Sequence, residues 1–121
     1  MDVWLRARIE ESRQGGLPCA WVAFADQEPV GSVSLVECNM DTRKDLTPWL
    51  SALFVVPAHR GGGIGAALVK RCEREAALAG ANRLYLYTER AVEYYRRLGW
   101  EVMFAEVYEE KPVTIMGKEL L

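Results

Sequence analysis

Residues 53–66 have the sequence LFVVPAHRGGGIGA, and the rest of the chain can be placed around this stretch. Its first four residues are apolar and include β-branched and aromatic side chains, which predicts the end of a buried strand. Pro57 removes a backbone donor and ends that strand. Glycine occupies four of the five positions after Arg60, and Ala66 begins a helical pattern of apolar residues. The stretch therefore predicts a strand, a glycine-rich turn and the start of a helix.

A turn of this kind aims backbone N–H groups at an anion. The first N–H groups of a helix have no partners within the helix, and the macrodipole places partial positive charge there. Glycine permits positive φ and lets a phosphate approach the backbone closely, and Arg60 can add a charge-assisted contact. A plain chain reversal needs one or two glycines rather than four. We therefore favour a phosphate-binding loop.

Two other phosphate-binding motifs must be compared with this loop. A P-loop requires Gly-Lys-Ser/Thr at the helix start, whereas Gly65 is followed by two alanines, which excludes that motif. The spacing Gly61-x-Gly63-x-x-Ala66 matches the loosest dinucleotide fingerprint, and Glu89 suits its ribose-binding acid. However, residues 57–60 separate the strand from the glycines, and the chain has room for one such unit only. A dinucleotide-binding fragment is kept as a weaker alternative.

The same residues resemble a known family signature. The segment 60–65 has the form Arg-x-x-Gly-x-Gly and follows a Val-x-Pro sequence at residues 55–57. This resembles the acetyl-CoA signature of the GNAT superfamily of N-acetyltransferases, in which the loop holds the pyrophosphate of coenzyme A. The resemblance implies acetyl-CoA as the cofactor, bound by Arg60, Gly61, Gly62, Gly63, Ile64, Gly65 and Ala66.

Composition limits the other possibilities. A chain of 121 residues, half of them hydrophobic, predicts a single domain over residues 1–121. A formal net charge of −2 without a basic stripe disfavours nucleic acid as a partner, and no apolar stretch is long enough to span a membrane. The three cysteines, at positions 19, 38 and 72, are widely spaced and form no metal-binding pattern. Together with the lack of a signal peptide, this predicts a cytoplasmic protein without a metal site.

Periodicity predicts the remaining elements. Residues 2–13 mix apolar and charged side chains, which predicts a short amphipathic helix ended by Gly15 and Gly16. A helical crossover joins residues 49–56 to residues 83–88, so these two strands should be parallel. The predicted strands are 19–25, 30–38, 49–56, 83–88, 100–108 and 113–120, and the later helices are 64–79 and 91–98. This order predicts an α+β fold with a mixed sheet, flanking helices and a central βαβ unit. It fits the GNAT-like fold that the resemblance implies, in which this unit carries the pyrophosphate loop.

The N-terminal part departs from the family pattern. Members of the family usually begin with a strand and a helix ahead of the helix predicted at residues 2–13, and this chain starts too late to hold them. A sheet edge would then be uncovered, and exposed edges tend to be paired or covered. We therefore predict a homodimer, in which a second chain supplies the missing edge.

The resemblance also implies residues for the chemistry. In the family, the strand before the loop diverges from its parallel neighbour, and its backbone pairs with the pantetheine arm; here this is the backbone of Leu53, Phe54 and Val55. The segment 91–100 resembles the family pattern Phe-Tyr-x-x-x-Gly-Phe, which places Tyr95 where an acid protonates the departing thiolate. The alternative is a tyrosine that packs in the core, and periodicity alone does not choose between Tyr94 and Tyr95.

The sequence does not identify the general base that would deprotonate the amine. Candidates are Glu37, Asp45, Glu89 and the single histidine, His59. Glu37 is preferred, because it ends its strand toward the expected cleft, although the family often deprotonates the amine through ordered water.

The implied function is an N-acetyltransferase that moves an acetyl group from acetyl-CoA to an amine by direct attack in a ternary complex. The acceptor is a small-molecule or peptide amine. No cysteine lies beside the histidine in sequence, which disfavours a covalent acyl-cysteine route. The second hypothesis is a non-catalytic acyl-CoA-binding or regulatory module.

Overall fold

The structure is a computed structural model that describes residues 7–12 and 19–120. The predicted strands at 19–25 and 83–88 are confirmed with these bounds, and the other elements after residue 18 shift by at most a few residues at their ends. The elements are β1 (Ala7–Ser12), β2 (Cys19–Ala25), β3 (Glu28–Val36), β4 (Trp49–Val55), the short 3-10 helix η2 (Pro57–His59), α1 (Ile64–Leu78), β5 (Arg83–Thr88), α2 (Val92–Arg97), β6 (Glu101–Tyr108) and β7 (Lys111–Glu119).

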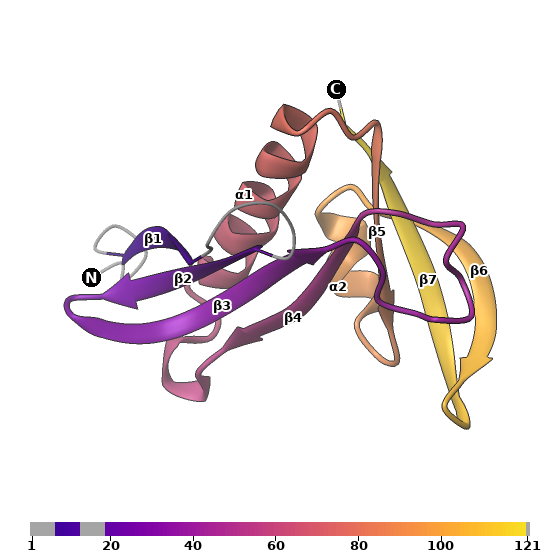
Figure 1. Cartoon of the computed structure of the whole chain (residues 1–121). Coiled ribbons are helices and arrows are strands. Elements are labelled where there is room, and N and C mark those ends of the chain that lie inside the picture. The colour runs from indigo at the N-terminus through magenta and orange to yellow at the C-terminus, as the bar shows by residue number, and fades with distance from the viewer. Residues whose placement is uncertain (1–6, 13–18, 121) are drawn as a thin grey trace.

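The strands form one mixed sheet in the order β1-β2-β3-β4-β5-β7-β6 (Figure 1). The pair β4–β5 is parallel, as the crossover through α1 requires, and every other described pair is antiparallel. The result is the α+β architecture with a central βαβ unit that the sequence predicts.

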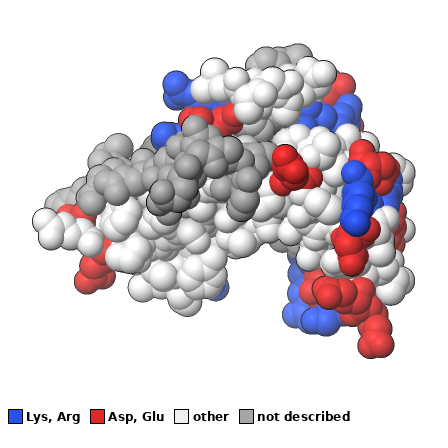
Figure 2. All heavy atoms as spheres, in the orientation of Figure 1, with Lys and Arg blue, Asp and Glu red and all other residues white. Residues whose placement is uncertain are grey.

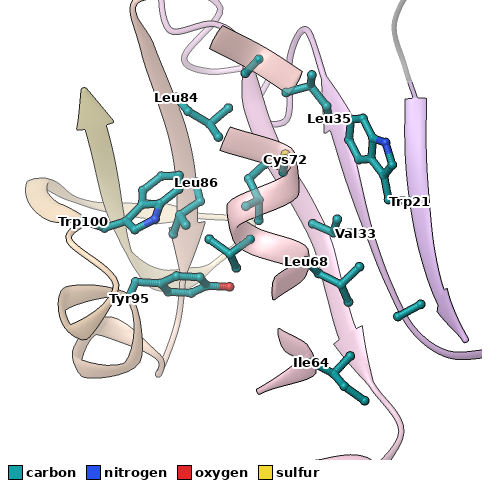
Figure 3. Packing of buried hydrophobic residues seen from close by; sticks show 14 of the residues in the cluster. Trp21, Val33, Leu35, Ile64, Leu68, Cys72, Leu84, Leu86, Tyr95 and Trp100 are labelled. Atoms are coloured by element: carbon teal, nitrogen blue, oxygen red, sulfur yellow. The ribbon is translucent and has the colours of Figure 1, made fainter. Parts of the chain in front are cut away.

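The main core lies between the sheet and the two helices. The apolar stripe of α1 is buried, with Leu68 and Cys72 fully enclosed, against side chains such as Trp21 and Leu86 from the strands (Figure 3). Tyr95 and Trp100 belong to the same cluster. Helices α1 and α2 therefore share one core, and this fixes the start of α1 relative to Tyr95.

A second, smaller cluster is covered by the loop over residues 37–48. Met40 and Leu46 of this loop are buried with Trp49, Val113 and Ile115. The indole Nε1 of Trp49 donates a hydrogen bond to the carbonyl oxygen of Leu46 at 2.6 Å, which satisfies its one polar atom. The polar loop therefore has an apolar inner side that packs on the sheet.

The prediction of a helix over residues 2–13 is wrong for its described part. Residues 7–12 form β1, which pairs antiparallel with β2 from Ala7 opposite Ala25 to Ser12 opposite Ala20. Residues 2–6 and 13 lie outside the described residues. A short helix in water is marginal, whereas the edge of β2 offers a row of backbone partners, so pairing decides the conformation. The edge on which the homodimer prediction rested is thus occupied by β1.

Charged groups of both signs are mixed on the surface. On the face shown in Figure 2 they gather over the part formed by β6 and β7, and the described residues form no broad basic area there. Within residues 7–12 and 19–120, no helix is both long and apolar enough to cross a bilayer.

Candidate functional site

Strands β4 and β5 meet at one point and then separate. Trp49 pairs with Tyr85, and the described residues contain no further β4–β5 pair. Ala52 has φ 55°, and β4 carries an extra residue opposite β3 at this point, which is a bulge that bends the strand away. On its other side β4 stays paired with β3, with Phe54 opposite Ser32. The backbone edge of Leu53–Val55 that faces β5 is therefore open to a ligand, as the family resemblance implies.

The glycine-rich loop takes the conformation for which glycine is needed. Gly61 and Gly63 have φ of 85° and 90°, which side chains rarely tolerate. Gly63 is the N-cap of α1, and no side chain among the described residues caps this end. The first intrahelical hydrogen bond runs from the Ala67 N–H to the Gly63 oxygen at 3.0 Å. The N–H groups of residues 64–66 lie ahead of that bond. Together with the helix dipole, they can receive an anion.

Arg60 is anchored beside this loop. Its Nε donates a hydrogen bond to the carbonyl oxygen of Val55 at 2.8 Å, and its guanidinium carbon lies 5.6 Å from the ring centre of Phe54. The side chain is exposed, and the hydrogen bond leaves its two terminal nitrogens able to reach a bound anion.

A cavity of about 550 Å³ connects these features, a volume within the range of small-molecule sites. It brings together nine of the predicted site residues and adds three that the sequence argument did not assign. The lining consists of Leu53, Phe54, Val55, His59, Arg60, Gly61, Gly63, Gly65, Ala66, Ala91, Tyr94 and Tyr95.

Three predicted site residues are not part of this lining. Gly62 lies in the loop without lining the cavity, and the side chain of Ile64 is buried in the core, so that only its backbone can serve. Glu37 lines a separate hollow with Lys44 and Thr47. Glu37 lies apart from the cavity because β3, which it follows, runs antiparallel to β4.

The register shows this directly. Gly31, near the start of β3, lies opposite Val55 at the end of β4, whereas Val36 lies opposite Trp49 at the start of β4. The cavity opens at the end of β4. Glu37, one residue beyond Val36, is therefore carried to the opposite end of the strand pair.

The other candidates for a base occupy different surroundings. Asp45 accepts hydrogen bonds from Arg43, which lowers the pKa of its carboxyl group. Glu89 lies 3.9 Å from the ammonium group of Lys111. His59 lines the cavity, and its Nδ1 is buried without a hydrogen-bond partner among the described residues.

Two adjacent tyrosines from α2 form one wall of the cavity. Tyr95 is buried, at 8% exposure, and its ring packs edge-on against Trp100 with centres 6.0 Å apart. Burial, with a smaller effect of Tyr94, raises the pKa of Tyr95 to about 12. Tyr94 is more exposed, and its hydroxyl lies 2.7 Å from where a Cβ on Gly65 would stand. Gly65 thus makes room for Tyr94, a contact between α1 and α2 that the local sequence does not reveal.

A second hollow of about 390 Å³ adjoins the first. Leu53 and Tyr95 line both. Its other lining residues come from the loop after β3 and from the diverging strands, and they are Asn39, Leu50, Ser51, Ala52, Leu86 and Tyr87. A molecule in each hollow would meet its neighbour beside Leu53 and Tyr95.

The described residues contain no group of histidine, cysteine and acidic side chains that could hold a metal ion. The polar groups that line the cavity are backbone groups, Arg60, His59 and the hydroxyls of Tyr94 and Tyr95.

Known proteins share both sequence and fold with this chain. The acetyltransferase (GNAT) family model matches residues 2–100. The peptidyl-lysine N-acetyltransferase YjaB of Salmonella typhimurium is 38% identical over 100 residues, which cover 80% of this chain and 61% of that protein. The chain thus spans about three fifths of the length of this curated relative.

Solved structures share the fold at lower identity. A crystal structure of aminoglycoside 6'-N-acetyltransferase complexed with coenzyme A has a TM-score of 0.73 and 21% identity, covering 86% of this chain and 73% of that one. A Bacillus subtilis acetyltransferase in complex with CoA has a TM-score of 0.77 and 15% identity, covering 95% and 99% of the two chains.

Proposed function

Because the chain belongs to the GNAT family of acetyltransferases, we propose that it transfers an acetyl group from acetyl-CoA to an amine acceptor by direct attack in a ternary complex. The observation that carries the proposal is the cavity in which the uncapped start of α1, the open edge of β4 and Tyr95 converge. These three features correspond to what acyl transfer from acetyl-CoA needs. The start of α1 is an anion site that positions the cofactor, the edge of β4 supplies backbone donors for the carbonyl oxygen, and Tyr95 is a proton donor for the leaving group.

The residues present fit coenzyme A. The pyrophosphate would be held by the first N–H groups of α1 and by Arg60, because both supply hydrogen-bond donors and positive charge beside the positive-φ glycines. The backbone edge of Leu53–Val55 that is not paired with β5 offers N–H and C=O groups to the amides of the pantetheine arm, apart from the Val55 oxygen, which already accepts the Arg60 hydrogen bond. A backbone N–H at this edge would also stabilise the oxyanion that forms at the thioester carbon.

The acceptor would enter through the second hollow. Its polar lining groups, Asn39, Ser51 and Tyr87, are uncharged, and the Ser51 hydroxyl donates to the Asn39 side-chain oxygen at 3.0 Å. An amine in this hollow would reach the thioester beside Leu53 and Tyr95. The relative YjaB is named as a peptidyl-lysine N-acetyltransferase, so a lysine side chain is the first acceptor to test.

Removal of the amine proton is assigned to water. The described residues that line the two hollows include no aspartate or glutamate, and His59 lies in the loop next to Arg60, on the side assigned to the pyrophosphate. The position of Glu37 on a separate hollow gives no support to its predicted role as base. The catalytic assignment is therefore restricted to Tyr95 as the proton donor.

The alternatives fit the geometry less well. A dinucleotide site needs a continuous parallel sheet at the loop, whereas β4 and β5 share a single pair. A non-catalytic acyl-CoA-binding module would need no second hollow, and here this hollow meets the cofactor cavity at Tyr95.

The test is a transfer assay with lysine peptides, polyamines and aminoglycosides. We expect acetyl-CoA to yield one free thiol for each acetyl group found on the acceptor by mass spectrometry, and no acyl-protein without acceptor. Coenzyme A should raise Tm in a thermal-shift screen, whereas NAD should not. Binding of coenzyme A without transfer to any acceptor would contradict catalysis and favour the non-catalytic module.

We further propose a homodimer, for a reason that differs from the sequence argument. β6 ends the sheet order and has β7 as its one strand neighbour in the described sheet, and its side chains Val102, Phe104 and Val107 are exposed. Apolar edges of this kind tend to be covered, here by β6 of a second copy. Light scattering at high protein concentration should give the mass of two chains, and a monomer mass would contradict the proposal.

A further inference from the structure

A set of charged and aromatic contacts fixes the end of α2, away from the cavity. The ammonium group of Lys118, on β7, donates to the carbonyl oxygen of Leu98 at 2.8 Å and lies 2.9 Å from Glu73 Oε1 on α1. The second oxygen of Glu73 accepts a hydrogen bond from the indole Nε1 of Trp100 at 3.1 Å. One Lys–Glu pair thus joins α1 and β7 to Leu98, which caps the C-terminal end of α2, and to Trp100, which precedes β6.

Gly99 leaves room for the Lys118 ammonium group beside the end of α2. Gly99 has φ 94°, and a Cβ there would stand 3.3 Å from Lys118 Nζ, tighter than ordinary packing. A cation at the C-terminal end of a helix also interacts favourably with the helix dipole. Helix α2 has six residues, too few for stability on its own, so contacts of this kind decide where it lies.

Tyr95 is connected to this group of residues in two ways. Its carbonyl oxygen accepts hydrogen bonds from the N–H groups of Leu98 and Trp100, both at 3.0 Å. Its ring packs against the Trp100 ring, whose indole N–H is held by Glu73. Movement of Leu98 or Trp100 would therefore move the Tyr95 phenol.

We propose that Lys118 and Glu73 are positioning residues for Tyr95. By holding the end of α2, they keep the Tyr95 phenol in the wall of the cofactor cavity. They touch neither hollow of the site, because both line a separate hollow of about 690 Å³ between α1 and the end of β7. Their side chains are 25% and 13% exposed, which shields the pair from much of the solvent. The consequence for turnover rests on the proposed function, whereas the placement of α2 does not.

The first experiment measures hydrogen exchange at the amides of Leu98, Gly99 and Trp100, which close the end of α2. Lys118→Met keeps the apolar stem and removes the ammonium group. We expect exchange to become at least about 10-fold faster, the factor that corresponds to loss of one charge-assisted hydrogen bond. The matched control is Lys111→Met, at the other end of β7, where the lysine is 65% exposed and 3.9 Å from Glu89. Exchange in α2 should be unchanged in this control.

The second experiment measures steady-state kinetics. Lys118→Met should lower kcat roughly 10- to 100-fold, as expected for a displaced catalytic group, with the Kd of coenzyme A changed less than about twofold. Lys118→Arg should restore most of kcat, because a guanidinium can still reach Glu73 and Leu98. In a Tyr95→Phe background, Lys118→Met should cause no further loss, because the positioned phenol is already absent.

Two outcomes would overturn the proposal. One is unchanged exchange in α2 of Lys118→Met, and the other is an equal loss of kcat in the presence and absence of the Tyr95 hydroxyl. If the wild-type protein acetylates no amine, the proposed function fails, and hydrogen exchange alone decides whether Lys118 holds α2.

Discussion

Tyr95→Phe should fold and bind acetyl-CoA like the wild type while its kcat falls by roughly 10²- to 10⁴-fold, the range for loss of a general acid. The phenylalanine ring keeps the packing against Trp100 at 6.0 Å. The variant loses the hydroxyl alone, from a residue that lines the cavity. An interaction made in the transition state only should lower kcat and leave cofactor affinity unchanged.

The pH dependence follows from the buried phenol. Its pKa of about 12 exceeds the pKa near 10 of a free tyrosine, so Tyr95 stays protonated throughout the range in which enzymes are assayed. The protonated form is the donor, so Tyr95 should cause no loss of kcat as pH rises from 7 to 10. A thiolate, whose conjugate acid has a pKa near 8.5, is a weaker base than this phenolate, so complete proton transfer from Tyr95 to the sulfur would be uphill. Tyr95 should therefore stabilise the leaving thiolate by donating a hydrogen bond as the carbon–sulfur bond breaks.

Tyr94→Phe is the matched control for this experiment. Tyr94 also lines the cavity, but it is 38% exposed and its hydroxyl lies over Gly65 at the start of α1. We expect most of the activity to be kept. Steady-state kinetics and melting temperatures of both variants should be measured together. Equal kcat in wild type and Tyr95→Phe would remove Tyr95 from the mechanism.

The part of the site that the sequence predicts is the part encoded within a short segment. The strand, the glycine loop and the start of α1 follow one another over residues 53–66, so local signals fix their order and their direction. Arg60 and Gly63 lie where this argument places them. For Tyr95 the local pattern predicts the helix, and the family resemblance of the same segment selects Tyr95 over Tyr94.

The features that the sequence does not predict depend on pairing between distant segments. β1 is a strand because β2 offers an edge, and its six residues alone do not choose between helix and strand. Glu37 is carried away from the cavity by the antiparallel register of β3 and β4. Lys118 and Glu73 lie 45 positions apart in sequence, at 2.9 Å from each other. Local patterns contain no information about such contacts.

Arg60→Ala should weaken coenzyme A binding by about 1.5–3 kcal/mol, or roughly 10- to 150-fold, the range for a hydrogen bond to a charged group. The structure gives Arg60 two contacts that hold it beside the glycine loop, its Nε bond to the Val55 oxygen and its position over Phe54. If its terminal nitrogens bind the pyrophosphate, the loss should be similar for dephospho-CoA, which keeps that group. Pantetheine lacks the pyrophosphate, so its affinity should not change.

Gly63→Val should weaken binding at least as much, because two effects combine. A valine at φ 90° is strained, and its side chain would enter the space from which an anion approaches the first N–H groups of α1. The matched control is Gly80→Val, since Gly80 has φ 96° and, like Gly63, leaves an added Cβ without a neighbour within 4 Å. Gly80 follows α1 at its far end, so this variant should lower the melting temperature and leave coenzyme A affinity intact. Calorimetry that finds unchanged affinity in both Arg60→Ala and Gly63→Val would contradict the pyrophosphate assignment.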